Sequence, residues 1–419
     1  MRALPLLLLL SLATTVRAED FQGSTHMVPF DEEIIDYSKK PAGGPIAELQ
    51  ARLDRGEVKL RFDDRYGWLP SLLDALKVPR SSQLLVFSKT SLQRNFITPR
   101  NPRALYYSDD VYLGYVPGAP LMEISAVDPQ LGGVFYTIEQ LPARKPKFTR
   151  EADCLRCHAA NRSMGVPGHI LRSIGTDETG ELDAQTEVSE IDHCTPFADR
   201  WAGWFVTGTH GAMTHRGNLI GAAAFARAAA EPGFNGNRTD LAGFFDAKEY
   251  LTQGSDVVAL MVLEHQAHMH NYITRLNYET QIMMAQYGHT RYLTKKVDAF
   301  LRYLFFTEEA PLTAPVAGHP EFVKEFAALG PRDTQGRSLR DFDLQTRLFR
   351  YPCSFLIYTP AFDHLPVIMR DQIYRRIWDI LRGEDASPDF ARIPPEQRQA
   401  VLEILLETKR GLPAYWKRS

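Results

Sequence analysis

Short apolar runs separated by turn residues dominate the chain from residue 81 to residue 141. The run at 83–88 is bounded by polar residues and predicts one strand. The Tyr-rich stretch 105–116 predicts two strands around an Asp-rich turn, and 121–127 and 133–139 predict a hairpin. Aromatic side chains suit packing on a half-buried sheet. This part of the chain is therefore expected to be predominantly β.

After residue 254, a helical pattern of apolar residues replaces the short apolar runs. Apolar residues at helical spacing predict one long helix, capped by Gly254 or Ser255 and ending near Gln286. The apolar stripe consists of Val258, Met261, Val262, His265, Met269, Tyr272 and Leu276. Further helices are expected over 45–53, 293–306, 321–329, 341–349, 370–381 and 395–409.

The middle of the chain follows neither pattern. A hairpin is expected where 170–174 and 182–188 flank a turn bounded by glycines, and an irregular Gly-rich segment follows over 200–218. The whole pattern predicts an α+β fold with a β-rich N-terminal part, a central segment and a helical C-terminal part. The expected regions are 1–18, 19–147, 148–250 and 251–419.

The first of these regions has the features of a signal peptide. Arg2 precedes an apolar run at 4–12, and Val16 and Ala18 are placed for cleavage before Glu19. The run is too short to cross a bilayer comfortably, and no later segment reaches a spanning length without charges. We therefore expect a periplasmic protein, exported through a cleaved signal peptide, with no permanent membrane span.

Composition excludes one class of partner. The formal net charge is −3, with 24% charged and 44% hydrophobic residues, as in an ordinary globular protein. This net charge does not favour a strongly basic surface, so we expect no nucleic acid partner.

One short motif carries specific chemistry. Cys154, Cys157 and His158 form the pattern C-x-x-C-H, which is typical of covalent c-type haem attachment. Two thiols at this spacing can each add to a vinyl group of one porphyrin, and the adjacent imidazole then ligates the iron. A zinc site would need a second ligand pair, but the only other cysteines, Cys194 and Cys353, lie far apart in the sequence. These two can form a disulfide in an oxidising compartment or remain unpaired thiols.

The sixth iron ligand separates an electron carrier from an enzyme. His265 shares the apolar stripe of the long helix and is the first candidate for the distal position. His210 and Met213, in the Gly-rich segment, are the alternatives. A ligated His or Met makes a low-spin carrier, whereas an open position lets a substrate reach the iron.

Three further groups could assist at such a site. Glu264, His268 and His210 are candidates for moving protons, since Glu264 lies one helical turn from His268. Arg200 can bind a haem propionate, or it can be a solvent-facing side chain next to a buried aromatic pair. A second metal held by Glu264, His265 and His268 is a further alternative, although these three lack a His pair at i, i+4.

On Cys154–His158 the chain resembles the c-type cytochromes. Over most of its length it is similar to large, largely uncharacterised exported bacterial proteins that carry a single haem. That wider similarity rests on 106–136, 165–169, 200–218, 260–271 and 351–358. The chain departs from small soluble cytochromes in its length, its β content and the long stretch before any plausible sixth ligand.

The sequence thus predicts one covalent haem c and single-electron transfer with a redox partner protein. The alternative is a haem-dependent oxidoreductase, peroxidase-like or otherwise, which binds a small-molecule substrate near the distal haem face. The single C-x-x-C-H motif does not favour a di-haem peroxidase.

Overall fold

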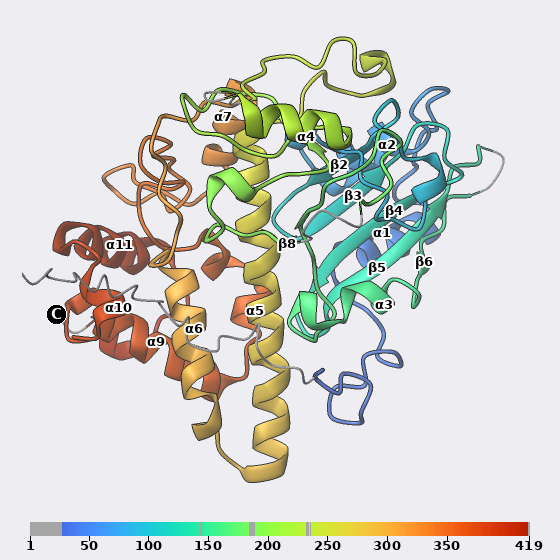
Figure 1. Cartoon of the computed structure of the whole chain (residues 1–419). Coiled ribbons are helices and arrows are strands. Elements are labelled where there is room, and N and C mark those ends of the chain that lie inside the picture. Colours follow the sequence, from blue (N-terminus) through green and yellow to red (C-terminus); the bar gives the residue numbers. More distant parts are fainter. Residues whose placement is uncertain (1–26, 143–144, 184–188, 232–233, 235, 418–419) are drawn as a thin grey trace, which may run out of the picture.

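A seven-stranded antiparallel sheet and a layered group of helices make up the computed structural model, which confirms the α+β prediction (Figure 1). The structure describes residues 27–142, 145–183, 189–231, 234 and 236–417. The signal peptide expected over 1–18 and part of the hairpin segment at 182–188 lie outside the described residues.

The sheet contains all the strands predicted between residues 81 and 141. Its order is β6-β5-β4-β3-β2-β1-β9. The strands are β1 (Leu84–Val86), β2 (Arg103–Tyr107), β3 (Val111–Tyr115), β4 (Leu121–Asp128), β5 (Gly132–Glu139), β6 (Thr149–Arg150) and β9 (Trp204–Phe205). A separate two-stranded ribbon pairs β7 (Arg172–Ser173) with β8 (Ser189–Glu190). Its first strand lies within the expected arm 170–174, whereas β8 begins just after the expected second arm, 182–188.

A tight turn sets the register of β4 and β5, which pair from Leu121↔Glu139 to Asp128↔Gly132. The Asp128 carboxylate accepts hydrogen bonds from the amides of Gln130 and Leu131, and Gly132 closes the turn at φ 69°. Because side chains alternate along a strand, this register decides which residues face which side of the sheet.

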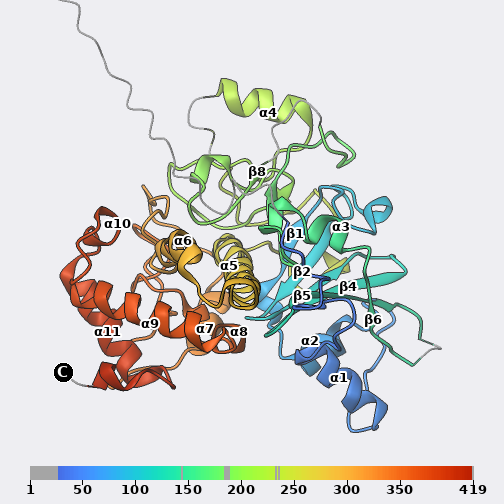
Figure 2. The same cartoon turned by 90° about the horizontal axis from the view of Figure 1, so that it is seen from below.

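The two faces of the sheet have different covers. Met122 and Ile124 of β4 belong to an apolar cluster with α1 (Gly44–Asp54) and α2 (Leu69–Leu76). Glu123 and Ser125 alternate with them and point to the opposite side. Figure 2 shows α1 and α2 on one face of the sheet and the short helix α3 (Leu155–His158) on the other.

The long helix α5 (Val257–Tyr287) stands between the sheet and the other C-terminal helices (Figures 1 and 2). Its N-cap is Asp256, whose side chain accepts from the Ala259 amide, so the helix begins slightly later than predicted. Gly288 ends it in the left-handed conformation, at φ 69°. Nearly all of its residues down to Thr280 are buried, since it is covered on both sides. It can therefore connect the sheet half to the helical half.

Most of the other helices agree with the predictions. The C-terminal helices are α6 (Thr294–Leu304), α7 (Pro320–Ala328), α8 (Pro360–Asp363), α9 (Val367–Arg382), α10 (Pro388–Ala391) and α11 (Pro395–Thr408). Among the described residues, five helices were not predicted: α2, α3, α4 (Gly221–Ala230), α8 and α10. Within the described part of the chain, no helix has the length and apolar character needed to cross a membrane.

The helix predicted over 341–349 is wrong. Asp343 accepts hydrogen bonds from the amides of Gln345, Thr346 and Arg347, which closes a turn instead of a helix. Leu344 has φ 56°, and Phe342 pairs with Phe349 in an isolated β-bridge. The hydrogen bonds to the Asp343 carboxylate therefore favour a turn over the helix that the apolar spacing of this segment predicts.

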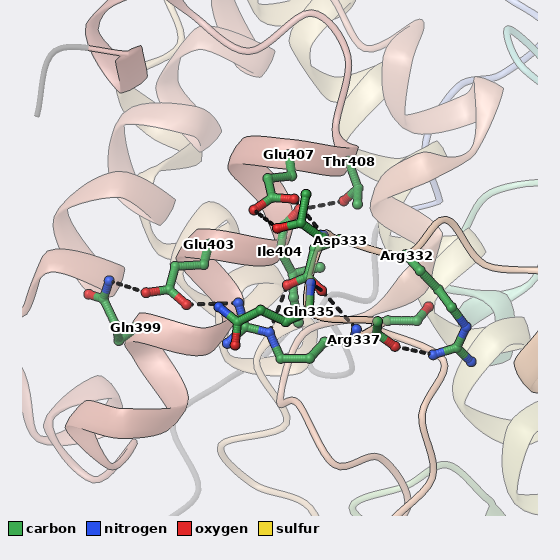
Figure 3. Close-up of polar contacts among 12 residues, drawn as sticks. Arg332, Asp333, Gln335, Arg337, Gln399, Glu403, Ile404, Glu407 and Thr408 are labelled. Carbon is green, nitrogen blue, oxygen red and sulfur yellow. Dashed lines mark hydrogen bonds and ion pairs between the residues drawn. The ribbon is translucent and has the colours of Figure 1, made fainter.

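A polar network joins the loop after α7 to α11 (Figure 3). Arg337 donates to Asp333 Oδ2 and to Glu403 Oε2, both at 2.7 Å. Thr334 donates to Glu407 from its amide and from its hydroxyl. The loop is thus held on the last helix by charge-assisted hydrogen bonds.

Candidate haem-attachment site

The C-x-x-C-H motif forms one helical turn. Cys154 is the N-cap residue of α3, and the His158 amide donates to its carbonyl at 2.9 Å. Neither Cys154 nor Cys157 is in a disulfide; Cys157 is exposed and Cys154 is half-buried. Burial raises the pKa of the Cys154 thiol to about 12, and the nearby carboxylates Glu123, Glu151 and Asp153 add to the rise. Both thiols are therefore available for covalent attachment.

The imidazole of His158 is held by one hydrogen bond. Its Nδ1 lies 2.9 Å from the Gly168 carbonyl oxygen and must donate to it, because that oxygen can only accept. Burial lowers the pKa of His158, with the Gly168 carbonyl opposing that shift, so the ring is neutral. Phe135 of β5 lies against it, with ring centroids 4.6 Å apart. Nε2 of the neutral ring therefore keeps a lone pair that can ligate a metal.

The backbone around His158 is closed into a compact loop. The Gly168 amide donates back to the His158 carbonyl at 2.8 Å. The Ser163 hydroxyl lies 3.0 Å from that carbonyl and 2.8 Å from the carbonyl of Val166. The ring orientation of His158 is thus fixed by residues that follow it closely in the sequence.

Two arginines near the motif have unused hydrogen-bonding capacity. Arg103 pairs with Glu123 at 2.9 Å, but its buried Nε has no hydrogen-bond partner among the described residues. Arg172 is half-buried and forms no side-chain hydrogen bond or ion pair within the described part of the chain. Burial lowers the pKa of Arg172, and the charge of Arg162 lowers it further.

These donors fit the chemistry of a haem. Both Arg103 and Arg172 contribute to lowering the pKa of His158, so their charges lie near its ring. A haem carries two propionate groups, and guanidinium groups bind carboxylates well. The thiols and His158 are the residue types that thioether attachment and iron ligation would use, and Arg103 and Arg172 would supply donors for the propionates.

The structure places His265, the first candidate for the sixth ligand, in the core between α5 and its neighbours. Its Nδ1 lies 2.8 Å from His193 Nδ1, and its Nε2 lies 2.8 Å from Ser354 Oγ. Tyr303 and Phe306 stack on its ring. Both nitrogens are occupied, so ligation of iron by His265 would require two hydrogen bonds to break.

His210 and Met213, the alternatives, lie in the loop between β9 and α4. His210 Nδ1 donates to the Met213 carbonyl at 2.7 Å, while its Nε2 is buried and lacks a hydrogen-bond partner among the described residues. The Met213 sulfur accepts from the Thr313 amide at 3.4 Å. His210 packs against His215, with ring centroids 4.7 Å apart. These contacts do not bring either residue to α3.

Arg200 and Glu264 form a fully buried ion pair. The Trp201 indole donates to the second oxygen of Glu264 at 3.1 Å, and Arg200 also donates to the carbonyls of Thr195 and His193. Burial raises the pKa of Glu264, and Arg200 and Trp201 oppose that rise. The guanidinium of Arg200 is thus engaged inside the protein, which leaves it no direction toward a haem propionate.

His268, the remaining candidate for moving protons, lies beside Asp192, whereas Glu264 is paired with Arg200. Its Nε2 lies 3.5 Å from an Asp192 carboxylate oxygen. Within the described residues, no group of three or more His, Cys, Asp or Glu side chains is arranged to hold a metal ion. The alternative of a metal bound by Glu264, His265 and His268 therefore has no support from their positions.

The other two cysteines do not form the disulfide that was one of the two outcomes expected from the sequence. No disulfide joins Cys194 to Cys353; Cys353 is fully buried and Cys194 is half-buried.

Sequence reasoning missed Arg103, Arg172 and Gly168. Arg103 lies on a strand 51 positions or so before the motif, as one basic residue among many, and nothing in its spacing indicates a shared site. Gly168 had a detectable signal, since Gly165, Pro167 and Gly168 form a turn-rich segment close after the motif. No family model, curated protein or solved structure is detectably similar to the chain, so the site is interpreted from its own residues.

Proposed function

We propose that this protein is a periplasmic c-type cytochrome that binds one covalent haem and transfers single electrons. The observation that carries the proposal is the arrangement of α3: two unpaired thiols on one turn, next to a neutral His158 whose Nδ1 donates to Gly168. A bound haem would supply the one-electron redox couple. Export through the segment 1–18 is part of the same proposal, because thioether attachment and an oxidising compartment go together in bacteria.

Each residue of the site has a defined task in this proposal. Cys154 and Cys157 would hold the porphyrin by thioether bonds, and His158 would ligate the iron through its Nε2. Arg103 and Arg172 would bind the propionates. Phe135 packs against His158 with its ring tilted by 43°, which limits rotation of the imidazole.

The second candidate function is a haem-dependent oxidoreductase acting on a small molecule. One observation favours it: His265 and Met213 are engaged by hydrogen bonds in the core, and His210 is sealed beside His215. If none of them moves, the distal position is open to a substrate. The candidates for moving protons in such a reaction are Glu264, His268 and His210; of these, Glu264 is paired with Arg200 and His268 lies beside Asp192.

The decisive experiment is expression of the full chain in a bacterial periplasm that contains the c-type haem attachment machinery. We expect the intact mass to exceed that of the apoprotein by one haem, and the denatured protein to keep its haem absorbance. The double variant Cys154→Ala/Cys157→Ala should lose the covalent haem, whereas the matched control Cys194→Ala/Cys353→Ala should keep it. An apoprotein mass for the wild type would overturn the proposal.

Spectra of the same material distinguish the two candidate functions. A carrier gives six-coordinate low-spin iron that binds carbon monoxide slowly or not at all. A high-spin ferric band with rapid carbon monoxide binding would favour the oxidoreductase.

A further inference from the structure

Two side chains of α5 hold the loop that carries the acceptor for His158. Asn271 accepts from the His169 amide at 2.8 Å and donates to the His169 carbonyl at 2.7 Å. One turn further along, Arg275 donates to the Met164 carbonyl and is itself held by Glu279. The loop 164–169 is therefore fixed at both ends by the same helix.

The contact between α5 and this loop has no spare room. A methyl group on Gly168 would collide with Asn271 Oδ1. A methyl group on Gly132, in the neighbouring sheet turn, would meet Thr274 and the Pro167 carbonyl. Because close-packed contacts transmit small displacements, a shift of Asn271 would move the backbone at 168–169.

That backbone includes the carbonyl oxygen that accepts the hydrogen bond from His158 Nδ1. The carbonyl oxygen of Gly168 is covalently adjacent to the His169 amide that Asn271 binds. A hydrogen bond from the outer nitrogen of a metal-bound histidine fixes the plane of the ring and increases the electron density that it gives to the metal. The strength of that bond depends on where the carbonyl lies.

We propose that Asn271 is a positioning residue for the axial histidine, and that α5 thereby sets the reduction potential of the haem. This inference rests on the proposed function, since it needs iron on His158. Asn271 reaches the site only through the peptide 168–169. Loosening that peptide weakens the bond from His158 Nδ1, makes the ligand a poorer donor and raises the potential, because the ferric state loses stabilisation.

The test is the midpoint potential of purified holoprotein carrying Asn271→Ala. We expect an increase equivalent to an approximately tenfold change in the equilibrium constant for reduction, about 59 mV for a one-electron couple. The paramagnetically shifted NMR signals of the His158 ring should move as well. The matched control is Asn277→Ala on the same helix. Its side-chain nitrogen makes long contacts of 3.4 and 3.5 Å to the turn at 129–130, and its oxygen accepts from Gln281 of the same helix, so none of its bonds reaches the loop 164–169.

A second variant keeps the test valid if Asn271→Ala fails to fold. Asn271→Leu has nearly the same size and carries no charge, but it can neither accept from the His169 amide nor donate to the His169 carbonyl, so a shift in the same direction is expected. The inference would be overturned if the holoproteins of both Asn271 variants had the same potential and NMR spectrum as the Asn277→Ala control. A wild type without covalent haem would instead overturn the proposed function.

Discussion

His193 and His265 share a hydrogen bond between their Nδ1 atoms, which lie 2.8 Å apart, so one ring donates and the other accepts. The neighbouring bond from His265 Nε2 to Ser354 Oγ completes a chain of three polar groups inside an aromatic layer. Burial lowers the pKa of both histidines well below the usual range, so both are neutral at pH 7. His193 and His265 are therefore a buried, hydrogen-bonded pair of core residues.

The first prediction concerns His265→Ala. We expect the absorption spectrum of the haem to stay unchanged, because both nitrogens of His265 are used within the core. The free energy of unfolding should fall by roughly 3 kcal/mol or more, since the change leaves a cavity and unpaired groups on His193 and Ser354. The comparison is His158→Ala, which should alter the spectrum. A changed spectrum for His265→Ala in a folded protein would make His265 the sixth ligand.

The second prediction concerns acid. Burial lowers the pKa of His270 to about 4, and its Nε2 donates to the Asp109 carbonyl. The unfolded chain takes up a proton below about pH 6.5, while the native chain does not, so stability falls as the pH drops from 6.5 to 4. His270→Gln can still donate to that carbonyl but does not titrate. Urea unfolding at several pH values measures how the free energy of unfolding depends on pH. In this window the slope for His270→Gln should be smaller than that of the wild type by about 1.4 kcal/mol per pH unit. An unchanged slope would contradict the assignment.

The third prediction concerns the buried ion pair. Glu264→Leu leaves the Arg200 guanidinium buried without its counter-charge, and should cost about 3–5 kcal/mol of unfolding free energy. The double variant Arg200→Met/Glu264→Leu removes both charges and should recover much of that loss. Denaturant unfolding of the three proteins measures this. A double variant less stable than Glu264→Leu would show that the Arg200 bonds to Thr195 and His193 matter more than the charge pair.

The fourth prediction concerns the network of Figure 3. Burial opposes ionisation of Asp333, but hydrogen bonds from the Arg337 amide and guanidinium outweigh it and lower the pKa of Asp333. Asp333 therefore stabilises the folded protein at pH values above the pKa that it has in the unfolded chain. This stabilisation is lost as the pH falls through the lower pKa that Asp333 has in the folded protein. Asp333→Asn should cost about 1–3 kcal/mol at pH 7, and the difference from wild type should shrink below about pH 4. Glu384→Gln, which disrupts an exposed pair with Arg382, is the control and should cost less than about 1 kcal/mol.

The fifth prediction tests the charges beside the haem. Removing a positive charge near the iron stabilises the ferric state, so Arg172→Met should lower the midpoint potential. We expect a roughly threefold or larger change in the equilibrium constant for reduction. Arg156→Met is the matched control, because Arg156 lies within the motif but its side chain is 83% exposed. Equal potentials for the two variants would exclude Arg172 from the haem environment.

The strands and the long helix could be predicted because local pattern and burial agree there. Alternation in β4 reflects one face on α1 and α2, and the polar N-terminal boundary of α5 marks a real cap. The segment 341–349 fails because the Asp343 carboxylate competes for the amides that a helix would use.

The site itself was predictable only in part. Cys154, Cys157 and His158 are adjacent in the sequence, so their spacing is sufficient to find them. Arg103 and Asn271 come to the site through sheet pairing and helix packing, which spacing along the chain does not encode. The inward position of His265 was inferred correctly from its helical stripe, but its partner His193 is 72 residues away and could not be inferred.

The two outermost strands of the sheet, β6 and β9, are each only two residues long, and the chain between them carries the C-x-x-C-H motif from one border of the sheet to the other. Removing β6 and β9 would uncover the backbone of β5 on one side and of β1 on the other. Uncovered strands of this kind recruit further chains and form aggregates. The two short strands that bound the stretch with the C-x-x-C-H motif therefore also protect the protein against self-association.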